Sequence, residues 1–424
     1  MRGSLLTVLF AGLVMMAQPA LADGLDAPNP SVRALASAGA RDVASEGIDA
    51  AWSNPAALAS LYERQFFVSV DWDGADATGV DAGSFITRPA STPAAVGGQV
   101  RTDGAAPQFN LSAGLGWRVS RRLLAGLSLA APYGQEVEAP AGTWSRYQAT
   151  AFDFSGANLR AGLAWLARRD LTLAIGIDIA YSRVRYDLAL PNLAAGSADG
   201  TLSYEATGLD AGWVLGARWS PLRRLTVGAS YSSGLNRGVS GGLRVSGLTG
   251  LVAGLNGEGT AAANIATPWV GAVGFDWRAG ASLTISGEIR CSGWSRFQGL
   301  RFASPAPVAG ALATGRDTTS YAFGAAYEVA PLVVLRAGYR FDPAALAPTA
   351  LFPGGSRRTY AAGLSFPIDR TAEVDLAVSW SEISGTSAES DIEVYSGAQA
   401  TSVSLRGAWR SSRPVVAVAL RRRM

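Results

Sequence analysis

Along most of the chain after residue 65, apolar and polar residues alternate with a period of two. Between Leu171 and Tyr181 every second residue is large and apolar, and the residues between them are small or polar. The segments 109–119 and 209–219 show the same alternation. A strand whose two faces meet different environments produces this pattern. The sequence therefore predicts β-strands with one apolar face and one small or polar face.

The predicted strands are long enough to cross a membrane. Many have about ten residues or more, with aromatic side chains toward their ends, as strands of a transmembrane barrel do. Strands of soluble sandwiches and propellers also alternate, but they average roughly five or six residues. We expect about fourteen strands, an even number that leaves both termini in the periplasm. They are placed near 65–72, 109–119, 123–132, 149–167, 171–186, 201–219, 224–235, 267–278, 282–296, 319–329, 332–341, 357–366, 372–383 and 401–410.

The connections between these strands alternate in length. Short connections such as Arg168–Asp170 are rich in charge and in turn-forming residues. Short periplasmic turns that alternate with long extracellular loops are typical of an outer-membrane barrel. The long loops are expected at 73–108, 133–148, 187–200, 236–266, 297–318, 342–356 and 384–400.

The N-terminus indicates export. Arg2 precedes the apolar run Leu5–Ala17 and the small-residue triplet Ala20–Ala22. This is the pattern of a signal peptide, residues 1–22, cleaved after Ala22. The apolar run is shorter than the roughly 20 residues that a spanning helix needs, and no later stretch comes close. We therefore expect a barrel in the outer membrane of a Gram-negative bacterium.

The segment 23–64 has helix-like spacing instead of alternation. The chain contains 50 glycines, which fall mostly on the face predicted to point into the barrel. Small inward residues allow another part of the chain to approach the wall closely. We therefore predict an all-β, about 14-stranded antiparallel transmembrane barrel, residues 65–424, with an N-terminal helical hatch, residues 23–64, in its lumen.

The amino-acid composition excludes several classes of catalytic and metal site. The 36 basic and 33 acidic residues give a net charge of +3, which does not indicate a nucleic-acid partner. With no histidine and a single cysteine, Cys291, disulfides, Cys/His zinc sites and Ser-His hydrolases are excluded. Cys291 is in phase with apolar residues of its strand, so it should face lipid or the barrel wall. We predict no enzyme activity, no cofactor and no metal.

Several short motifs resemble those of the FadL family (OMPP1/FadL/TodX), outer-membrane transporters of long-chain fatty acids and other hydrophobic compounds. The small-residue stretch Ala34–Asp42 is followed by Asn54–Ala56 just before the first predicted strand. The segment Ala131–Gly134 is similar to the kinked third strand of the family, and Ser292–Phe297 and Tyr339–Asp342 also fit. The resemblance covers essentially the whole mature chain, in order.

The resemblance implies a monomeric barrel closed by a hatch, through which a ligand diffuses and leaves sideways beside the third-strand kink. Carried over to this sequence, the hatch contains Asn54, Pro55 and Ala56, and the lateral opening lies at Pro132, Tyr133 and Gly134. We expect these two elements to touch. No ligand-binding residue can be assigned at this stage.

Local chemistry supports the kink. Pro132 lacks the N–H that a ladder needs and Gly134 tolerates bent backbone, so pairing should fail there. The alternative is a simple turn that closes a strand at the membrane edge. For Asn54–Ala56 the alternative is a turn that ends a short helix, because a residue before proline avoids the helical region.

Three further expectations concern the outer end of the barrel. Trp294 and Phe297 are expected at the outer rim as interfacial aromatics. The loop 236–266 is unusually apolar and should form either an outer groove for hydrophobic ligand or a helical lid. At the C-terminus, either 403–409 is the final strand and a basic tail follows, or the register differs there.

The sequence thus predicts a transporter of hydrophobic small molecules, long-chain fatty acids or aromatic hydrocarbons. Its expected partners are the ligand, outer-membrane lipid, lipopolysaccharide and the assembly machinery. Two alternatives stay open: a structural or adhesion barrel, and a polar-solute pore, which would need a charged constriction and an open lumen. Apolar pockets discriminate weakly, so the sequence does not name the substrate.

Overall fold

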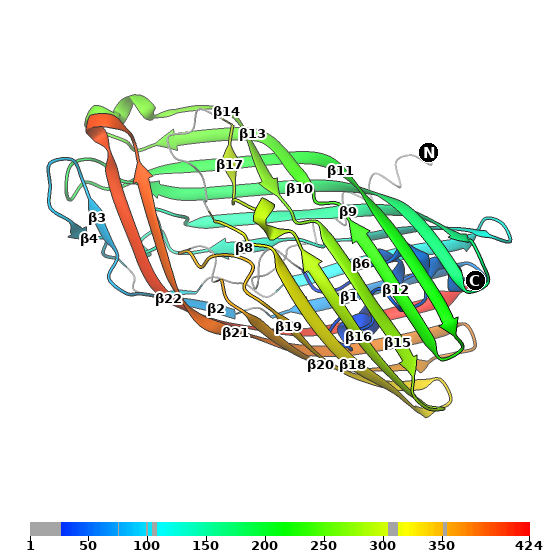
Figure 1. Cartoon of the computed structure of the whole chain (residues 1–424). Coiled ribbons are helices and arrows are strands. Elements are labelled where there is room, and N and C mark those ends of the chain that lie inside the picture. The colour runs from blue at the N-terminus through cyan, green and yellow to red at the C-terminus, as the bar shows by residue number, and fades with distance from the viewer. Residues whose placement is uncertain (1–26, 75, 99–100, 104–107, 304–312, 351–353) are drawn as a thin grey trace.

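The computed structural model describes residues 27–424 apart from 75, 99–100, 104–107, 304–312 and 351–353, so the expected signal peptide lies outside it. Fourteen antiparallel strands form a closed wall (Figure 1). The wall closes because β1 (Gln65–Asp73) pairs with β6 (Gln108–Arg118) on one side and with the last strand, β22 (Thr401–Arg423), on the other. The predicted barrel is confirmed.

The remaining wall strands follow one another in chain order, each antiparallel to the next. Every one of them overlaps a strand predicted from the alternation. They are β7 (Leu123–Ala130), β9 (Ala151–Leu166), β10 (Leu171–Leu190), β11 (Gly200–Leu222), β12 (Leu225–Ser232), β15 (Val270–Arg278), β16 (Leu283–Ser292), β18 (Thr318–Ala330), β19 (Val333–Asp342), β20 (Arg357–Pro367) and β21 (Ala372–Val394).

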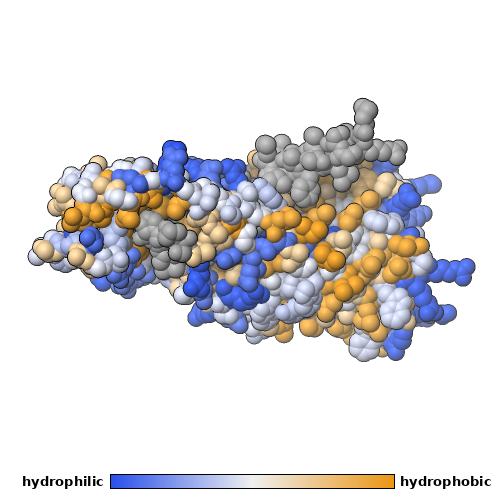
Figure 2. Space-filling view, turned by 90° about the horizontal axis from the view of Figure 1, so that it is seen from above, coloured by the Kyte–Doolittle hydropathy of each residue, from blue (hydrophilic) through white to orange (hydrophobic). Residues whose placement is uncertain are grey.

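The outer surface of the wall is apolar. Ile175 and Ile177 are 56% and 58% exposed, whereas Gly176 between them is inside and Asp178 is buried. Figure 2 shows apolar side chains over much of the surface and hydrophilic ones at the end that carries the short turns. Cys291 shares the outward register of Ile289, as expected. Within the described residues, no helix is both long and apolar enough to span a bilayer.

The last two strands are longer than predicted. β21 continues to Val394, through part of the expected loop, and β22 continues to Arg423. Residues 415–423 of β22 pair with the whole of β1. Of the two alternatives for the C-terminus, the basic tail after Trp409 is therefore wrong, because closure of the wall requires a partner along the full length of β1.

The long loops contain strands of their own, most of them short. These are β2 (Asp76–Asp81), β3 (Phe85–Thr87), β4 (Ala94–Ala95), β5 (Arg101–Asp103), β8 (Gln135–Glu138), β13 (Asn236–Ser246), β14 (Gly257–Ala266) and β17 (Arg301–Phe302). By pairing with the outer parts of wall strands such as β11 and β22, they extend the wall beyond its apolar outer surface.

The loop 236–266 is neither an open groove nor a helical lid. It is a hairpin of β13 and β14 joined by the short 3-10 helix η3 (Gly250–Leu255). β13 pairs with the outer half of β11, which turns Val245 inward, and Val252 of η3 is buried as well. Leu248 is buried too, whereas Leu251 and Leu255 of η3 are 81% and 44% exposed.

The placement of Trp294 and Phe297 at an exposed rim is also wrong. Trp294 is 2% exposed and Phe297 is fully buried. The short helix η4 (Trp294–Arg296) follows β16 directly and folds both rings inward, with their centroids 5.9 Å apart. They join a large apolar cluster inside the extracellular part of the wall.

The N-terminal segment, residues 27–64, lies inside the wall (Figure 1). It contains the helix α2 (Val32–Leu35) and the 3-10 helices η1 (Ala50–Trp52) and η2 (Pro55–Ser60). A Cβ added to Gly228 would meet the Val43 carbonyl, and one added to Gly338 would meet the Ser37 backbone. The prediction that inward glycines allow close approach is confirmed at these positions.

Deletion of residues 411–424 should prevent assembly of the barrel. It removes the partners of β1 and of β21 from Ala372 to Ile383, leaving two open edges. We expect no heat-modifiable band in electrophoresis of outer membranes. Deletion of Met424 alone is the control, since its amide makes one hydrogen bond to Arg64. A heat-modifiable band from the larger deletion would contradict the closure.

Substitution of Gly228 by alanine should loosen the N-terminal segment. The added methyl group meets the backbone carbonyl of Val43, which cannot move aside as the end of a flexible side chain could. We expect a loss of about 1–3 kcal/mol in unfolding free energy, measured by urea titration in detergent. The Gly242→Ala variant on β13, where the methyl group meets open space, is the control. Equal stability of the two variants would argue against the tight contact.

Candidate functional site

The third strand of the wall is interrupted at residues 131–134. β7 pairs with β9 as far as Ala130 opposite Asn158, and the ladder resumes at Gln135 opposite Phe154. This strand advances five residues while β9 advances four, so one extra residue is inserted, as in a bulge. On its other side, the continuous ladder with β6 ends at Ala113 opposite Leu129. Continuous pairing is therefore lost around Pro132–Gly134, as the sequence predicts for this kink.

The N-terminal segment contacts the kink through its first described residue. The Ala27 amide donates a hydrogen bond of 3.0 Å to the Pro132 carbonyl. Asn54 lies elsewhere: its Nδ2 donates to the Val43 carbonyl at 2.7 Å and to the Ala217 carbonyl on β11 at 3.0 Å. Its Oδ1 accepts from the Ala56 amide at 3.0 Å.

Asn54, Pro55 and Ala56 thus fix the segment to the wall. Asn54 is fully buried and caps η2, and Pro55 lies against Gly162 of β9 and Gly216 of β11. These residues hold the segment to the wall strands, whereas Ala27 reaches the kink. The segment thus reaches the kink through Ala27, and the expected contact between Asn54–Ala56 and the kink stays a prediction.

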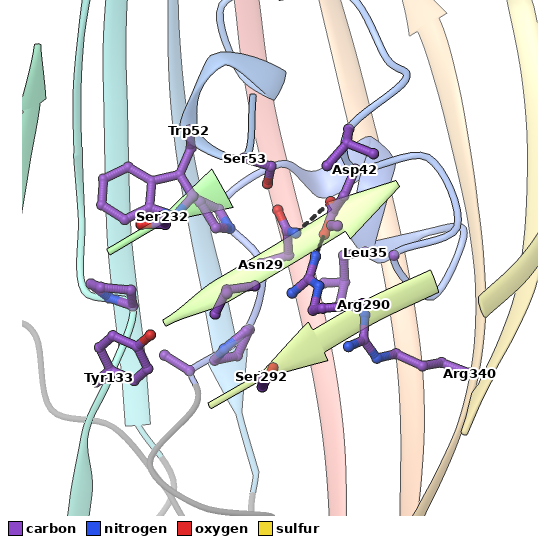
Figure 3. A pocket seen from close by; sticks show the side chains of 18 of the residues that line it. Asn29, Leu35, Asp42, Trp52, Ser53, Tyr133, Ser232, Arg290, Ser292 and Arg340 are labelled. Atoms are coloured by element: carbon purple, nitrogen blue, oxygen red, sulfur yellow. Dashed lines mark hydrogen bonds and ion pairs between the residues drawn. The ribbon is translucent and has the colours of Figure 1, made fainter. Parts of the chain in front are cut away.

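A cavity of about 210 Å³ lies between the N-terminal segment, the kink and the inner wall. Trp52 and Ser53 of the segment and Pro132 and Tyr133 of the kink line it. Figure 3 shows Trp52 and Tyr133 on one side of this cavity, with Arg340 on the opposite side. The cavity therefore joins the two regions that the sequence singles out.

The cavity wall combines apolar side chains, such as Leu35 and Val415, with charged and hydroxyl groups. Arg413 donates to Asp73 at 2.9 Å, and Asp342 accepts from Arg340 at 2.7 Å and from Arg357 at 3.0 Å. Buried guanidinium and carboxylate groups of this kind are tolerated when they are paired. Hydroxyl groups also line the cavity, from Ser53, Ser230, Ser232, Ser233, Ser292, Thr267, Thr359, Ser379 and Ser381.

One corner of the cavity holds a chain of polar contacts that begins at the N-terminal segment. The Arg160 guanidinium lies over the Trp52 ring, 4.3 Å from its centroid, and donates to Asp178 at 2.8 Å. Asn158 donates to the same carboxylate at 3.1 Å. Arg160, Asp178 and Asn158 are all buried, so this corner is fixed within the wall.

The extracellular part of the interior is aromatic. Phe302 lies 4.9 Å from Tyr204 and 6.5 Å from Tyr186 between ring centroids, and Phe152 packs on Tyr186. At the edge of this cluster, burial raises the pKa of Tyr147 to about 12, so its neutral hydroxyl donates to Asp199 at 2.9 Å. The extracellular part of the interior is thus a packed apolar cluster.

The sequence did not single out Arg160, Asp178 or Asn158. Asp178 is a charged residue on the inward face of the predicted strand 171–186, and this position could have indicated a polar site. Its partners lie on a different strand, so their meeting depends on register. In the described part of the chain, no three Asp, Glu or Cys side chains gather in a way that could hold a metal.

A closed wall with an apolar outer face, a lumen occupied by its own N-terminal segment and an interrupted strand defines a transmembrane β-barrel of the transport type. The chain belongs to the family of outer membrane protein transport proteins, OMPP1/FadL/TodX, whose model matches residues 13–423. Proteins of this family are transport channels of the outer membrane. No protein among those with curated functions matches the sequence.

Solved structures share the fold. A FadL homologue of Pseudomonas aeruginosa superposes with a TM-score of 0.81 at 17% identity, over 94% of this chain and 99% of that one. The toluene transporter TbuX of Ralstonia pickettii gives 0.65 at 14% identity, over 95% and 99%. The toluene transporter TodX of Pseudomonas putida gives 0.65 at 15% identity, over 95% and 99%.

Substitution of Asn54 by alanine should release η2 from the wall. The change leaves the Val43 and Ala217 carbonyls and the Ala56 amide without this partner, which should cost about 2 kcal/mol or more. Faster hydrogen exchange of the Ser53 and Ala56 amides is the expected result. The control is Asn256→Ala, which removes two hydrogen bonds to Leu248 in the outer hairpin. Unchanged exchange at Ser53 and Ala56 would contradict this anchoring role.

Proposed function

We propose that this protein carries hydrophobic small molecules across the outer membrane by diffusion. Residues 23–64 act as a hatch that blocks the lumen, and the ligand leaves sideways through the wall at Pro132–Gly134. The observation that supports this most is the cavity shared by the hatch and the kink, at the place where pairing of the wall is interrupted.

The sideways exit follows from the solvation of an apolar ligand. A route straight through the barrel would release it into periplasmic water, at a cost proportional to its apolar area. A break in the wall delivers the apolar part into lipid instead. Pro132 and Gly134 supply such a break without leaving a ladder donor at Pro132 unpaired.

The cavity favours ligands with a polar end. Beside its apolar side chains, the lining includes paired charges and hydroxyl groups, which would have to lose water against a pure hydrocarbon. We therefore place long-chain fatty acids ahead of aromatic hydrocarbons. Aromatic hydrocarbons are the second candidate, because two structures that share the fold are toluene transporters.

The cellular setting is also part of the proposal. Residues 1–22 are a signal peptide removed after Ala22, and the mature barrel works as a monomer in contact with outer-membrane lipid and lipopolysaccharide. The outer-membrane assembly machinery inserts it. The hatch argues against the polar-solute pore, because Arg41 and Glu46 tie it to Asp276 and Arg218 of the wall.

Uptake of radiolabelled oleate and toluene tests the transport reaction. Cells that express this protein as their only such barrel should take up oleate, and Gly134→Arg should reduce uptake to near the level of cells without it. The arginine places a bulky charged side chain at a buried position of the kink. Gly254→Arg, the same change where a side chain meets open space, is the control.

The outcomes separate the alternatives. Uptake that falls in Gly134→Arg and in Asn54→Ala, but not in the control, supports the hatch and the lateral exit. Normal uptake in Gly134→Arg at equal surface abundance would refute the lateral exit. Absence of uptake of both ligands by the wild-type protein would favour a structural or adhesion role.

A further inference from the structure

Four neighbouring turns at one end of the wall are rich in exposed arginine. They join β6 to β7, β9 to β10, β11 to β12 and β15 to β16, and these strands follow one another around the wall. Their exposed arginines form a basic arc with a single carboxylate beside it, that of Asp170. The arc consists of Arg121, Arg122, Arg168, Arg169, Arg223, Arg224 and Arg278.

The positive charge of the basic arc is largely unpaired. Arg168 forms an ion pair with Asp170 at 2.6 Å, and in the part of the chain that the structure describes no other arginine of the arc does so. The next turn around the wall, Glu328–Leu332 between β18 and β19, has a carboxylate and no basic residue. On its other side the arc borders β1 and the C-terminal Arg422 and Arg423. The excess charge is therefore concentrated on one side of this rim.

A row of tryptophans lies on the outer face of the wall beside the arc. Trp165, Trp219 and Trp277 are 49%, 44% and 47% exposed. Each pairs with the first strand residue after a neighbouring turn of the arc, as Trp165 does with Leu123, which follows Arg122. Indole rings on the outside of a barrel settle at the level of the lipid head groups. The arc therefore lies at the head-group level of the leaflet on the side of the short turns, the hydrophilic end in Figure 2.

The chemistry of the arc fits a phosphate carried by a lipid. A guanidinium group offers a planar pair of N–H donors that matches two phosphate oxygens. Clusters of basic residues beside a membrane attract anionic lipids, whereas a zwitterionic head group carries an ammonium group that they repel. Acyl chains also pack against the exposed indole rings, a contact that a soluble anion does not make. The observations thus favour an anionic phospholipid over a free phosphate.

We propose that the basic arc binds anionic phospholipids and enriches them around this sector of the barrel. The head-group phosphate lies on the arginines, and the acyl chains run along the tryptophan row into the hydrocarbon layer. This inference goes beyond the transport function and does not depend on it, because no residue of the arc lines the cavity between the hatch and the kink.

Retention of lipid by the purified full-length protein tests the proposal. The protein in detergent is mixed with equal amounts of dioleoyl phosphatidylglycerol and dioleoyl phosphatidylethanolamine, and the bound lipids are counted by native mass spectrometry. The wild-type protein should retain the anionic lipid in about tenfold excess or more, because several arginines contribute to the attraction. The arc variant should lose most of this excess. It combines Arg121→Gln, Arg122→Gln, Arg223→Gln and Arg224→Gln.

A matched control removes the same charge from exposed arginines at the outer end of the wall. It combines Arg244→Gln, Arg301→Gln, Arg316→Gln and Arg406→Gln, and it should retain lipid as the wild-type protein does. Substitution of the four arc residues by lysine keeps the charge and should keep most of the excess. Heat-modifiable migration checks that each variant is folded.

Three results would overturn the proposal. They are a wild-type protein that retains both lipids equally, an arc variant that keeps the excess, and a control that loses as much of it as the arc variant does. Deacylated phosphatidylglycerol, the same head group without chains, should not displace the lipid at equal concentration. Displacement would make the arc a site for soluble anions and would overturn the lipid assignment. None of these results bears on the uptake of oleate or toluene, so the transport function is tested separately.

Discussion

The structure depends on the requirement that backbone polar groups in hydrocarbon be hydrogen-bonded within the protein. A sheet meets this requirement only when its first and last strands pair, and here residues 65–73 pair with 415–423. The length of β22 follows from this need. The kink at Pro132–Gly134 is the place where the rule is relaxed, and Pro132 lowers the cost because it has no N–H to leave unpaired.

The N-terminal segment packs against this closed wall with little side chain between the two backbones. Glycines on several strands allow Ser37 and Val43 to lie against the sheet, and ion pairs from Arg41 and Glu46 fix the segment from inside. Close backbone approach and charge pairing act together. The glycines leave room for the backbone of the segment, and the ion pairs fix its position against the wall.

The alternation predicted the wall strands because contact with lipid requires every second side chain of each strand to be apolar. It failed where lipid is absent: β13 and β14 were read as a loop, and Trp294 and Phe297 as a rim, although all pack in an interior beyond the apolar band. The kink could be found from Pro132 and Gly134 alone. The polar corner could not, because Asn158 and Arg160 of β9 meet Asp178 of β10 only through the register of the two strands.

The long outer halves of β10, β11, β21 and β22 have a consequence for the cell surface. β11 has 23 residues, which extended would measure roughly 75 Å, against about 30 Å of hydrocarbon. The excess carries a packed apolar interior well beyond the hydrocarbon layer. Under the proposed function, a hydrophobic ligand would leave water at the tip of this extension, well outside the surface of the bilayer.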